Sequence, residues 1–508
     1  MHSRLSAMAA VLPIALAGLF LARDAVPQTA GAGGAAVEPP PAPAARPAIA
    51  PGPVHDHVPE LEAAVRAMAG DAKFKDAQIG VAILDCDTGH YLATSNEHGA
   101  LNPASNAKVY TAGAALAMLG AEHRYETALF GTAKDGEVQG PLVLRGHGDP
   151  SLTTADLFAL AEELHAQGVR RVSGDLLVDQ HLWDDQTTPP AFEQQPNEWS
   201  AFRAPISAVA VNENTVTLSV RPTQAGSPAL VTFDPPGFVD VDGTVATGEG
   251  RDTVILALSG NGKRLAAKVS GSVGSDARVV RYTRRVEDPS LLAGYALRSV
   301  FDKVGIKVAG EVKVGTSTKG NLLARHESEP LAQLLSSLGK QSDNFYAEMV
   351  FKTLATEVKG RPGKSADAAD LVGRWINKIG AGDTGVAIKN GSGLFDANRT
   401  TATSLVLFLR AMWRDPTVQP EFLAQFAVGG VDGTLHKRFR ATRHHGAIRA
   451  KTGTLQDAIA LSGYVLGPPG RSPLAFSILF NQVAGKADVA RSASDKLVEI
   501  LLRRQWGE

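Results

Sequence analysis

The stretch Leu101-Asn102-Pro103-Ala104-Ser105-Asn106-Ala107-Lys108 leads into an Ala-rich apolar segment over residues 109–119. This pattern predicts a helix, with Asn102 suited to its N-cap and Pro103 to its first position. Ser105 and Lys108 then lie three residues apart on one face of the first turn, beside free backbone N–H groups and the positive end of the helix dipole. The spacing predicts a serine nucleophile with a lysine as its base. Taken alone, it also fits an ordinary serine at a helix start.

A second motif, Ser342-Asp343-Asn344, precedes a helical pattern over residues 344–358. A hydroxyl carried by a loop can relay a proton to a leaving group, and the Asn344 amide can hold a substrate carbonyl. Ser, Asp and Asn are also the residues favoured at a helix N-cap. The catalytic and the capping interpretations can hold together.

The third motif, Lys451-Thr452-Gly453-Thr454, lies in a strand predicted over residues 449–455. Lys451 offers a charge for a substrate carboxylate, and the Thr452 hydroxyl offers a hydrogen bond beside it. Gly453 lets a substrate backbone approach closely, and the N–H of Thr454 can pair with that of Ser105 as an oxyanion hole. By itself this motif would also fit an edge strand with a bulge glycine.

The two lysines are expected to influence each other. A lysine can accept a proton from a serine only when it is neutral, and burial and a nearby cation both lower a lysine pKa. Lys451 would be the second cation that lowers the pKa of Lys108. The three motifs therefore predict one catalytic site.

Other partial matches to known sequence motifs are weaker evidence for a functional site. Ser337-Leu338-Gly339-Lys340 also fits the S-x-x-K spacing, but it lies where a predicted helix gives way to a loop. The stretch from Gly360 to Ser365 resembles the end of a phosphate-binding loop, yet its glycines are too close together and a proline interrupts it. His444 and His445 are expected to be solvated loop residues. The sequence therefore predicts neither a metal site nor a cofactor.

Composition excludes several classes of protein. The 508 residues hold 51 Lys and Arg against 52 Asp and Glu, a net charge of −1, which argues against a nucleic-acid-binding protein. The single cysteine, Cys86, rules out a disulfide scaffold and a cysteine zinc cluster. We expect it to be a buried residue at the end of a strand, without a catalytic role.

The amino terminus has the pattern of an export signal. Residues 8–22 form an uninterrupted apolar run that is short for a spanning helix, which usually needs about 20 residues. Residues 1–24 are predicted to be a signal peptide, with an uncleaved signal anchor as the alternative. Residues 25–53 contain 10 Ala, 8 Pro and 4 Gly, which predicts a disordered linker. Either interpretation places the rest of the chain outside the cytoplasm.

The folded part divides by pattern. Helical periodicity and apolar strands dominate residues 54–125 and 320–508, where strands are predicted over 78–85, 460–466 and 474–481 and a final helix over 488–504. Residues 126–319 are rich in short alternating runs, interrupted by one clear helix over 154–167. The sequence predicts one α/β (α+β) domain interrupted by a strand-rich insertion of two nested modules.

The three motifs in this order are shared by class A β-lactamases and penicillin-binding proteins. The separation 342 − 105 = 237 is much longer than a compact β-lactamase allows. The chain resembles the D-alanyl-D-alanine carboxypeptidase/endopeptidase family, the class C low-molecular-mass penicillin-binding proteins (peptidase family S13). Further stretches that resemble the family begin at Gly148-Asp149-Pro150, Ala204-Pro205-Ile206, Val211-Asn212-Glu213-Asn214, Asn390-Gly391-Ser392-Gly393 and Gly430-Val431-Asp432-Gly433. Asn390 stands where Asp is expected in many relatives.

The resemblance implies a serine β-lactamase/DD-transpeptidase-like catalytic domain, with an antiparallel sheet flanked by helices, formed by residues 54–125 and 320–508. It implies a penicillin-sensitive serine DD-peptidase of the periplasm that cleaves D-alanyl-D-alanine in peptidoglycan stem peptides, with β-lactams as covalent inhibitors. D-alanyl-diaminopimelate cross-links are a further expected substrate, for which Glu198 is a candidate contact; a solvated surface carboxylate is the alternative.

By resemblance, Ser105 attacks the carbonyl and Lys108 takes its proton. Ser342 and Lys451 help to return a proton to the leaving D-alanine, while Asn344, Thr452 and Thr454 position the substrate. A β-lactamase, a DD-esterase and a peptidoglycan-binding scaffold without activity are the alternatives. The sequence leaves open any dimer and any peripheral contact with a membrane.

Overall fold

The computed structural model describes residues 54–508, so the predicted signal peptide and linker lie outside the described residues. Ten α-helices occur in this range. Their bounds are α1 Pro59–Ala69, α2 Ala107–Leu119, α3 Thr154–Ala166, α4 Leu292–Val304, α5 Leu331–Gly339, α6 Asn344–Lys359, α7 Ser365–Lys378, α8 Ala402–Trp413, α9 Gln419–Ala424 and α10 Ala487–Trp506. None of these helices has the length and apolarity needed to cross a membrane.

An antiparallel six-stranded sheet lies at the centre of the motif-bearing part, in the order β2-β1-β23-β22-β21-β20. Its strands are β1 Gln78–Asp85, β2 Tyr91–Ser95, β20 Ala427–Val428, β21 Ile448–Thr454, β22 Ala458–Val465 and β23 Leu474–Asn481. β1 pairs with β23 along its whole length, from Gln78 opposite Asn481 to Asp85 opposite Leu474. Segments almost 400 residues apart in sequence thus build one sheet.

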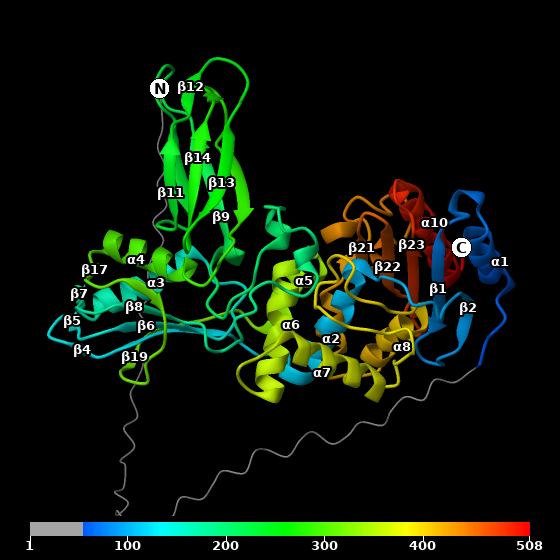
Figure 1. Cartoon of the computed structure of the whole chain (residues 1–508). Coiled ribbons are helices and arrows are strands. Elements are labelled where there is room, and N and C mark those ends of the chain that lie inside the picture. The colour runs from blue at the N-terminus through cyan, green and yellow to red at the C-terminus, as the bar shows by residue number, and fades with distance from the viewer. Residues whose placement is uncertain (1–53) are drawn as a thin grey trace, which may run out of the picture. The chain divides into compact units, whose positions relative to one another are not determined.

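Helices cover both faces of this sheet (Figure 1). Successive strand side chains point to opposite faces, so Val81 and Ile83 pack with α1 and α10. Ala82 and Leu84 pack on the other face, with α2 and α8 among others. Because both faces are covered, β1 reads as a continuous apolar run rather than as an alternating pattern.

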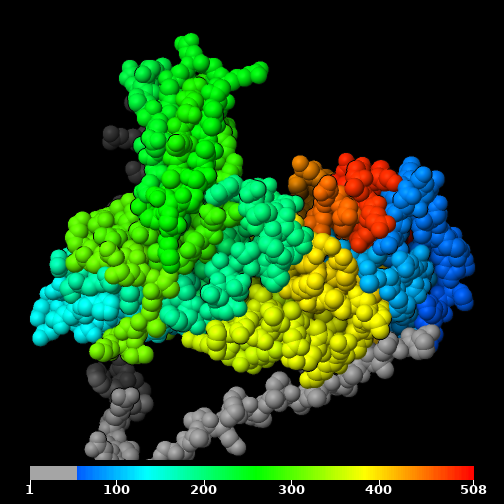
Figure 2. All heavy atoms as spheres, in the orientation of Figure 1, coloured from blue at the N-terminus to red at the C-terminus, as the bar shows by residue number. Residues whose placement is uncertain are grey.

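The first and last helices of the described chain lie side by side. Leu61 and Val65 of α1 share one core with Leu497 and Leu501 of α10, and all four are fully or almost fully buried. Figure 2 shows the corresponding blue and red segments next to each other. This contact places both ends of the described chain on the same face of the six-stranded sheet.

The strand-rich segment contributes no strand to the six-stranded sheet within the described residues. Its largest sheet has the order β18-β8-β6-β3-β19 and packs against α3 and α4. The strands of this segment are β3 Glu126–Gly131, β4 Ala133–Lys134, β5 Glu137–Val138, β6 Leu142–Gly146, β7 Arg171–Val172, β8 Leu176–Asp179, β9 Thr215–Arg221, β10 Leu230–Asp234, β11 Val239–Gly243, β12 Ala246–Gly248, β13 Ile255–Asn261, β14 Arg264–Ser270, β15 Ser272–Gly274, β16 Val280–Arg285, β17 Lys307–Val308, β18 Val312–Val314 and β19 Asn321–Glu327.

The structure differs from the sequence-based expectation in several elements. The strand expected over residues 172–178 is two strands, β7 and β8, separated by a turn. The segment also contains a second helix, α4, whose buried face includes Leu297 and Val300. α8 was not predicted, because a helix that is buried almost all round lacks the polar face that gives helical periodicity.

Candidate active site

Ser105 lies on a short 3₁₀ turn, Ala104–Asn106, which runs directly into α2. The predicted start of the helix is wrong in detail, since α2 itself begins only at Ala107 and Pro103 precedes the 3₁₀ turn rather than starting the helix. The Asn102 side chain accepts a hydrogen bond of 2.9 Å from the N–H of Ala104, whose φ is +46°. Asn102 therefore holds the left-handed backbone that presents Ser105.

Lys108 is fully buried and uses all three N–H bonds of its ammonium group. It donates to Ser105 Oγ at 3.0 Å, to Asn344 Oδ1 at 2.7 Å and to the carbonyl oxygen of Ser392 at 2.7 Å. The first contact is the one that the S-x-x-K spacing predicts. The second brings the first two motifs together across 236 residues of sequence.

Ser392 and its support from Glu348 were not predicted as parts of the site. The Glu348 carboxylate, buried in α6, accepts hydrogen bonds from the N–H groups of Gly391 and Ser392 at 3.2 and 2.8 Å. Glu348 thereby holds the loop in which the carbonyl oxygen of Ser392 accepts a hydrogen bond from Lys108. A sequence signal existed, because Glu348 is one helical turn after Asn344 within an otherwise apolar run.

Lys451 joins the third motif to the second. Its ammonium group is fully buried and donates to Ser342 Oγ at 2.7 Å and to the carbonyl oxygen of Thr452 at 2.8 Å. Ser342 has a φ of +63°, in the left-handed region that residues other than glycine and asparagine rarely adopt. Backbone strain of this kind gathers at functional sites.

Burial changes the pKa of both lysines. Desolvation lowers the pKa of Lys108 to about 7, against the smaller opposing effects of Asp343 and Glu348. Desolvation, and then repulsion by Lys108, lower the pKa of Lys451 well below its usual value. Burial thus lowers the pKa of Lys108, as one part of the expectation has it, whereas the repulsion between the two lysines is found as a cause at Lys451 and not at Lys108.

The second motif caps α6, as the capping interpretation predicts, and its Asn344 also contacts Lys108. Asp343 Oδ1 accepts a hydrogen bond of 3.0 Å from the N–H of Tyr346. Asn344 Nδ2 donates to the carbonyl oxygen of Phe202 at 2.9 Å. Because an amide nitrogen carries two hydrogens, this contact leaves one N–H of Asn344 for a substrate carbonyl.

The N–H of Thr454 points away from β22. The N–H of Leu455 donates to the carbonyl oxygen of Ala458, and hydrogen-bonded pairs alternate along antiparallel strands. The Thr454–Ile459 pair is therefore not hydrogen-bonded, and its N–H groups face outward. Within residues 54–508, β20 covers β21 only at Arg449 and Ala450, so this edge is open beside the 3₁₀ turn that carries Ser105.

Gly453 has a packing role besides the one expected. A Cβ atom at this position would lie 2.8 Å from the carbonyl oxygen of Pro103 and 3.0 Å from the Cβ of Ala104. The glycine thus allows β21 to approach the turn that carries Ser105, and the close approach of a substrate backbone stays a prediction. The Thr452 hydroxyl donates to Thr434 Oγ1 at 2.9 Å.

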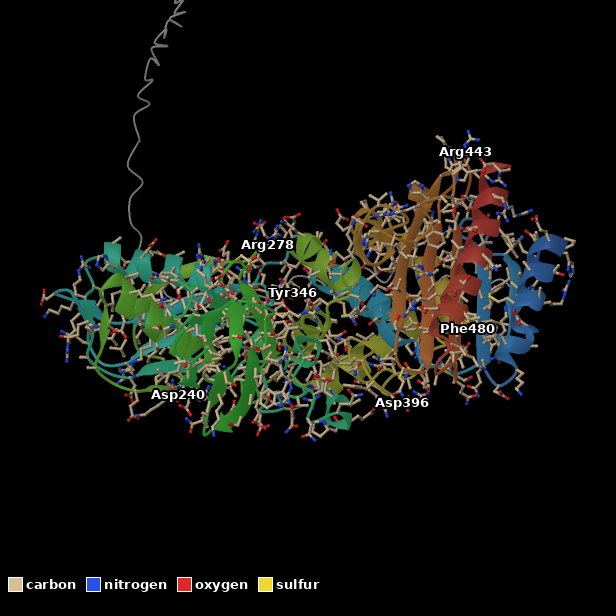
Figure 3. All side chains as sticks on the ribbon, turned by 90° about the horizontal axis from the view of Figure 1, so that it is seen from above. Asp240, Arg278, Tyr346, Asp396, Arg443 and Phe480 are labelled. Atoms are coloured by element: carbon tan, nitrogen blue, oxygen red, sulfur yellow. The ribbon has the colours of Figure 1, made fainter. Side chains whose placement is uncertain are left out.

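A cavity of about 840 Å³ opens onto Ser105. Ser342, Asn344 and Thr454 also line it, together with the apolar side chains of Phe202 and Phe395. Its volume lies in the range of small-molecule sites. Figure 3 labels Asp396, one of the two carboxylates among its lining residues, the other being Asp457.

Glu198 is not among the residues that line this cavity. Its carboxylate accepts hydrogen bonds from the N–H and the hydroxyl of Ser200 at 2.8 and 2.6 Å, and these bonds lower its pKa. The alternative interpretation, a locally satisfied surface carboxylate, describes its surroundings better than a contact with substrate.

The remaining sequence candidates lie elsewhere. Ser337 is inside α5, and Lys340 forms an ion pair with Asp432. Cys86 follows β1 and is fully buried, and this burial raises the pKa of its thiol. His444 stacks on Trp506 with ring centroids 3.9 Å apart.

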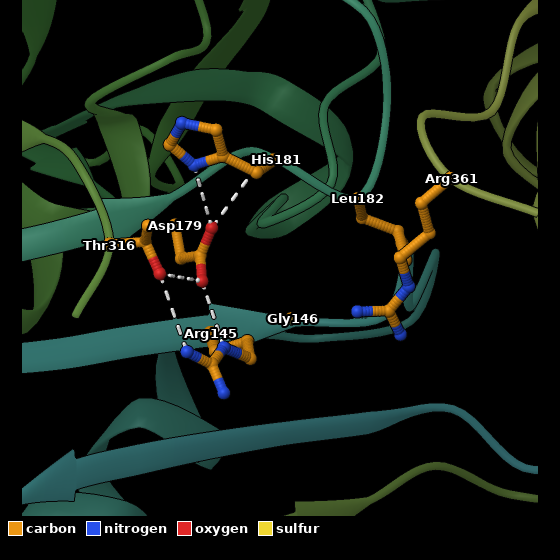
Figure 4. Close-up of a pocket in the computed structure, with 7 residues that line it drawn as sticks. All are labelled: Arg145, Gly146, Asp179, His181, Leu182, Thr316 and Arg361. Atoms are coloured by element: carbon orange, nitrogen blue, oxygen red, sulfur yellow. Dashed lines mark hydrogen bonds and ion pairs between the residues drawn. The ribbon is translucent and has the colours of Figure 1, made fainter. Parts of the chain in front are cut away.

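A second cavity, of about 300 Å³, contains no residue of the three motifs (Figure 4). Asp179 accepts hydrogen bonds from Arg145 Nε at 2.8 Å and from Thr316 Oγ1 at 2.7 Å, and His181 also contacts it. The loop after α6 contributes Arg361. Its groups form a network of ion pairs and hydrogen bonds around Asp179.

Comparison with known proteins agrees with this geometry. The family model of the D-Ala-D-Ala carboxypeptidase 3 (S13) family matches residues 61–504. The chain belongs to the S13 family. This confirms the predicted family and, with it, the predicted enzyme class, a serine-type D-Ala-D-Ala carboxypeptidase.

Individual S13 relatives cover most of the chain. It is 34% identical over 452 residues to a D-alanyl-D-alanine carboxypeptidase of Actinomadura sp. (strain R39), covering 85% of this chain and 82% of that protein. It is 24% identical over 414 residues to the D-alanyl-D-alanine carboxypeptidase DacB of Haemophilus influenzae, covering 78% of this chain and 83% of the relative.

Solved structures confirm the predicted fold class. The crystal structure of penicillin-binding protein 4 (dacB) from Haemophilus influenzae superposes with a TM-score of 0.73 at 24% identity, covering 86% of this chain and 99% of that chain. The same protein in complex with a β-lactam gives a TM-score of 0.68 at 24% identity, covering 87% and 99%. The S13 chain therefore has the fold of this penicillin-binding protein.

Asn390, the departure from the expected S13 pattern, takes part in contacts that an aspartate could not make. Its Nδ2 donates to the carbonyl oxygens of Pro190 and Leu394 at 2.9 and 3.3 Å. A carboxylate only accepts hydrogen bonds. Asn390 thus ties the loop that carries Ser392 to the segment around residue 190.

Proposed function

We propose that Ser105 is the nucleophile of a penicillin-sensitive DD-peptidase, which cleaves the bond between two D-alanines in peptidoglycan stem peptides. The observation that carries this proposal is the buried Lys108, with a pKa of about 7 and Nζ 3.0 Å from Ser105 Oγ. At neutral pH about half of such lysines are neutral, so Lys108 can accept the serine proton.

Acylation begins when Ser105 Oγ attacks the carbonyl carbon and its proton passes to Lys108 Nζ. The N–H groups of Ser105 and Thr454 are proposed to stabilise the oxyanion, because both border the cavity. The C–N bond then breaks and leaves an ester on Ser105. The free N–H of Asn344 and the Thr452 hydroxyl are proposed to position the substrate.

The leaving D-alanine needs a proton on its nitrogen. Ser342 Oγ accepts a hydrogen bond from Lys451 at 2.7 Å and lines the cavity, so this pair is proposed to deliver the proton. Lys451 also offers positive charge to the substrate carboxylate. Water then hydrolyses the ester on Ser105 and regenerates the serine.

The remaining parts of the proposal concern substrates and location. β-Lactams are proposed to acylate the same serine, as the β-lactam complex of the Haemophilus influenzae protein suggests. D-Alanyl-diaminopimelate cross-links are proposed as further substrates. Because peptidoglycan lies outside the cytoplasm, the enzyme is proposed to be exported to the periplasm by the signal predicted over residues 1–24.

Mass spectrometry of the intact protein after incubation with penicillin tests the nucleophile. We expect a mass increase of one penicillin, located on the peptide that contains Ser105, and no increase in Ser105→Ala. Folded wild-type protein without an adduct would contradict the proposal. Rapid loss of the adduct with release of hydrolysed penicillin would instead indicate the alternative, a β-lactamase.

Muropeptides test the substrate. Release of free D-alanine would support carboxypeptidase activity, whereas cleavage of cross-linked dimers to monomers would support endopeptidase activity. If penicillin acylates Ser105 but the protein cleaves neither monomeric nor cross-linked muropeptides, the peptidase proposal is contradicted.

A further inference from the structure

A strained turn in the strand-rich segment reaches the start of α6. Asn212, Glu213 and Asn214 have φ values of +48°, +57° and +50°, three consecutive left-handed residues without a glycine. Residues other than glycine rarely adopt such a backbone, and it persists only where the surroundings hold it.

The two asparagines hold this turn on either side of Glu213. Asn212 accepts a hydrogen bond from the N–H of Thr154 and donates to Asp234, both at 3.0 Å. Asn214, fully buried, donates to the carbonyl oxygen of Pro205 at 3.0 Å. The turn is therefore held from two directions, with Glu213 between the two anchors.

The Glu213 side chain forms a hydrogen bond with the side chain of Asp343, the central residue of the second motif. Two carboxyl groups can form such a bond only if one of them carries a proton. Asp343 already accepts from the N–H of Tyr346 at the start of α6. This favours Asp343 as the carboxylate and Glu213 as the protonated partner.

Asp343 connects this pair to the reacting groups. It lies between Ser342 and Asn344 in the sequence. Ser342 accepts a hydrogen bond from Lys451, and Asn344 accepts one from Lys108. The charge of Asp343 also acts on Lys108, where it opposes the effect of burial. A movement of the Asp343 carboxylate would thus shift both motif side chains.

We infer that Glu213 is a positioning residue of this site, which holds Asp343, and through it Ser342 and Asn344, by a hydrogen bond with a shared proton. The inference rests on the proposed function, because its readout is acylation of Ser105. It assigns to the strand-rich segment a role in the chemistry of a site that the other part of the chain carries.

The charges around the pair set its dependence on pH. Desolvation and the charge of Asp343 raise the pKa of Glu213 to about 7. Asp343 and Tyr346, at the start of α6, both interact with Glu213. Asp149, in the loop before α3, acts on Tyr346, and the charge of Lys108 acts on Asp343. Above neutral pH Glu213 loses its proton, so the hydrogen bond is replaced by repulsion between two carboxylates.

Stopped-flow acylation of the full-length protein by a fluorescent penicillin, from pH 5.5 to 9, tests the inference with Glu213→Gln and Glu213→Ala. Glutamine keeps an N–H donor to Asp343 but does not titrate. We expect Glu213→Gln to match the wild type within about twofold at pH 6, and Glu213→Ala to be slower by about tenfold, because a hydrogen bond to a charged group is lost. At pH 9 we expect Glu213→Gln to exceed the wild type.

Glu162→Gln, which removes an exposed carboxylate from α3, is the matched control and should follow the wild-type profile. Thermal unfolding of each variant separates loss of fold from loss of rate. If the wild type and Glu213→Gln show the same dependence of acylation rate on pH, the inference is overturned. It is also overturned if both Glu213 variants stay folded and lose the same fraction of the acylation rate. Wild type that is not acylated would instead overturn the proposed function.

Discussion

Lys108 illustrates how burial gives a residue its chemistry. An exposed lysine has a pKa near 10.4 and carries a proton at neutral pH. Here desolvation lowers the pKa of Lys108 to about 7, while three acceptors orient its ammonium group. The sequence named the residue, but the size and the main cause of its pKa shift come from the packing around it.

This pKa predicts the pH dependence of acylation. Only neutral Lys108 can accept the Ser105 proton, so the rate should rise by about tenfold per pH unit in acid and level off near pH 7. Acylation kinetics with a chromogenic β-lactam between pH 5 and 10 measure this rise and where it stops. A rate that keeps rising to pH 10 would show that Lys108 is not the titrating base.

At the scale of elements, the site depends on how closely β21 approaches the turn that carries Ser105. Gly453 permits that approach, since a Cβ atom there would lie 2.8 Å from the carbonyl oxygen of Pro103. The same strand buries Lys451 and points the N–H of Thr454 outward. One glycine thus sets the separation between two of the three motifs.

Gly453→Ala should therefore impair acylation and stability together. The added methyl group forces β21 and the turn apart, and overpacking of this kind costs typically about 1–3 kcal/mol. Urea unfolding and the rate of penicillin acylation measure the two effects. Gly446→Ala, just before β21, is the control, because a Cβ atom there meets nothing within 4 Å; equal behaviour of the two variants would contradict the role of Gly453.

At the scale of the molecule, α6 joins the two kinds of structure. Its Lys352, with 1% of the side chain exposed, pairs with Asp184 from the segment after β8, and Trp183 Nε1 donates to Thr356 Oγ1 at 3.0 Å. We propose that residues 54–125 and 328–508 form one domain, interrupted by a strand-rich insertion that ends later than the predicted residue 319. Because β19 pairs with β3, the sheet of the strand-rich part extends to Glu327.

The Lys352–Asp184 pair predicts a coupling across this junction. Asp184→Asn leaves the Lys352 ammonium group buried without its counter-charge, and such losses cost about 3 kcal/mol. Adding Lys352→Met should recover most of that loss, which a double-mutant cycle in urea would measure. The exposed pair Lys307–Asp302 is the control and should contribute less than about 1 kcal/mol; equal costs for the two pairs would contradict the prediction.

Elements with a strong local signal were predicted well. β1 and β23 have the predicted bounds, and α10 extends the predicted helix by one residue at its start and two at its end. α4 and α8 were missed as elements, and the strand expected over residues 172–178 is two strands. These segments are positioned by burial and long-range pairing, which the local pattern of residues does not encode.

The sequence by itself determined the three motifs, their order and the family to which the chain belongs, because the spacing within each motif is a local property. Only the tertiary structure decided what surrounds them: the carbonyl oxygen of Ser392, the buried Glu348 and the contact of Glu213 with Asp343. The physical reason is that pKa values and hydrogen-bond partners depend on distances and desolvation. Those quantities arise only when residues far apart in the chain are packed together.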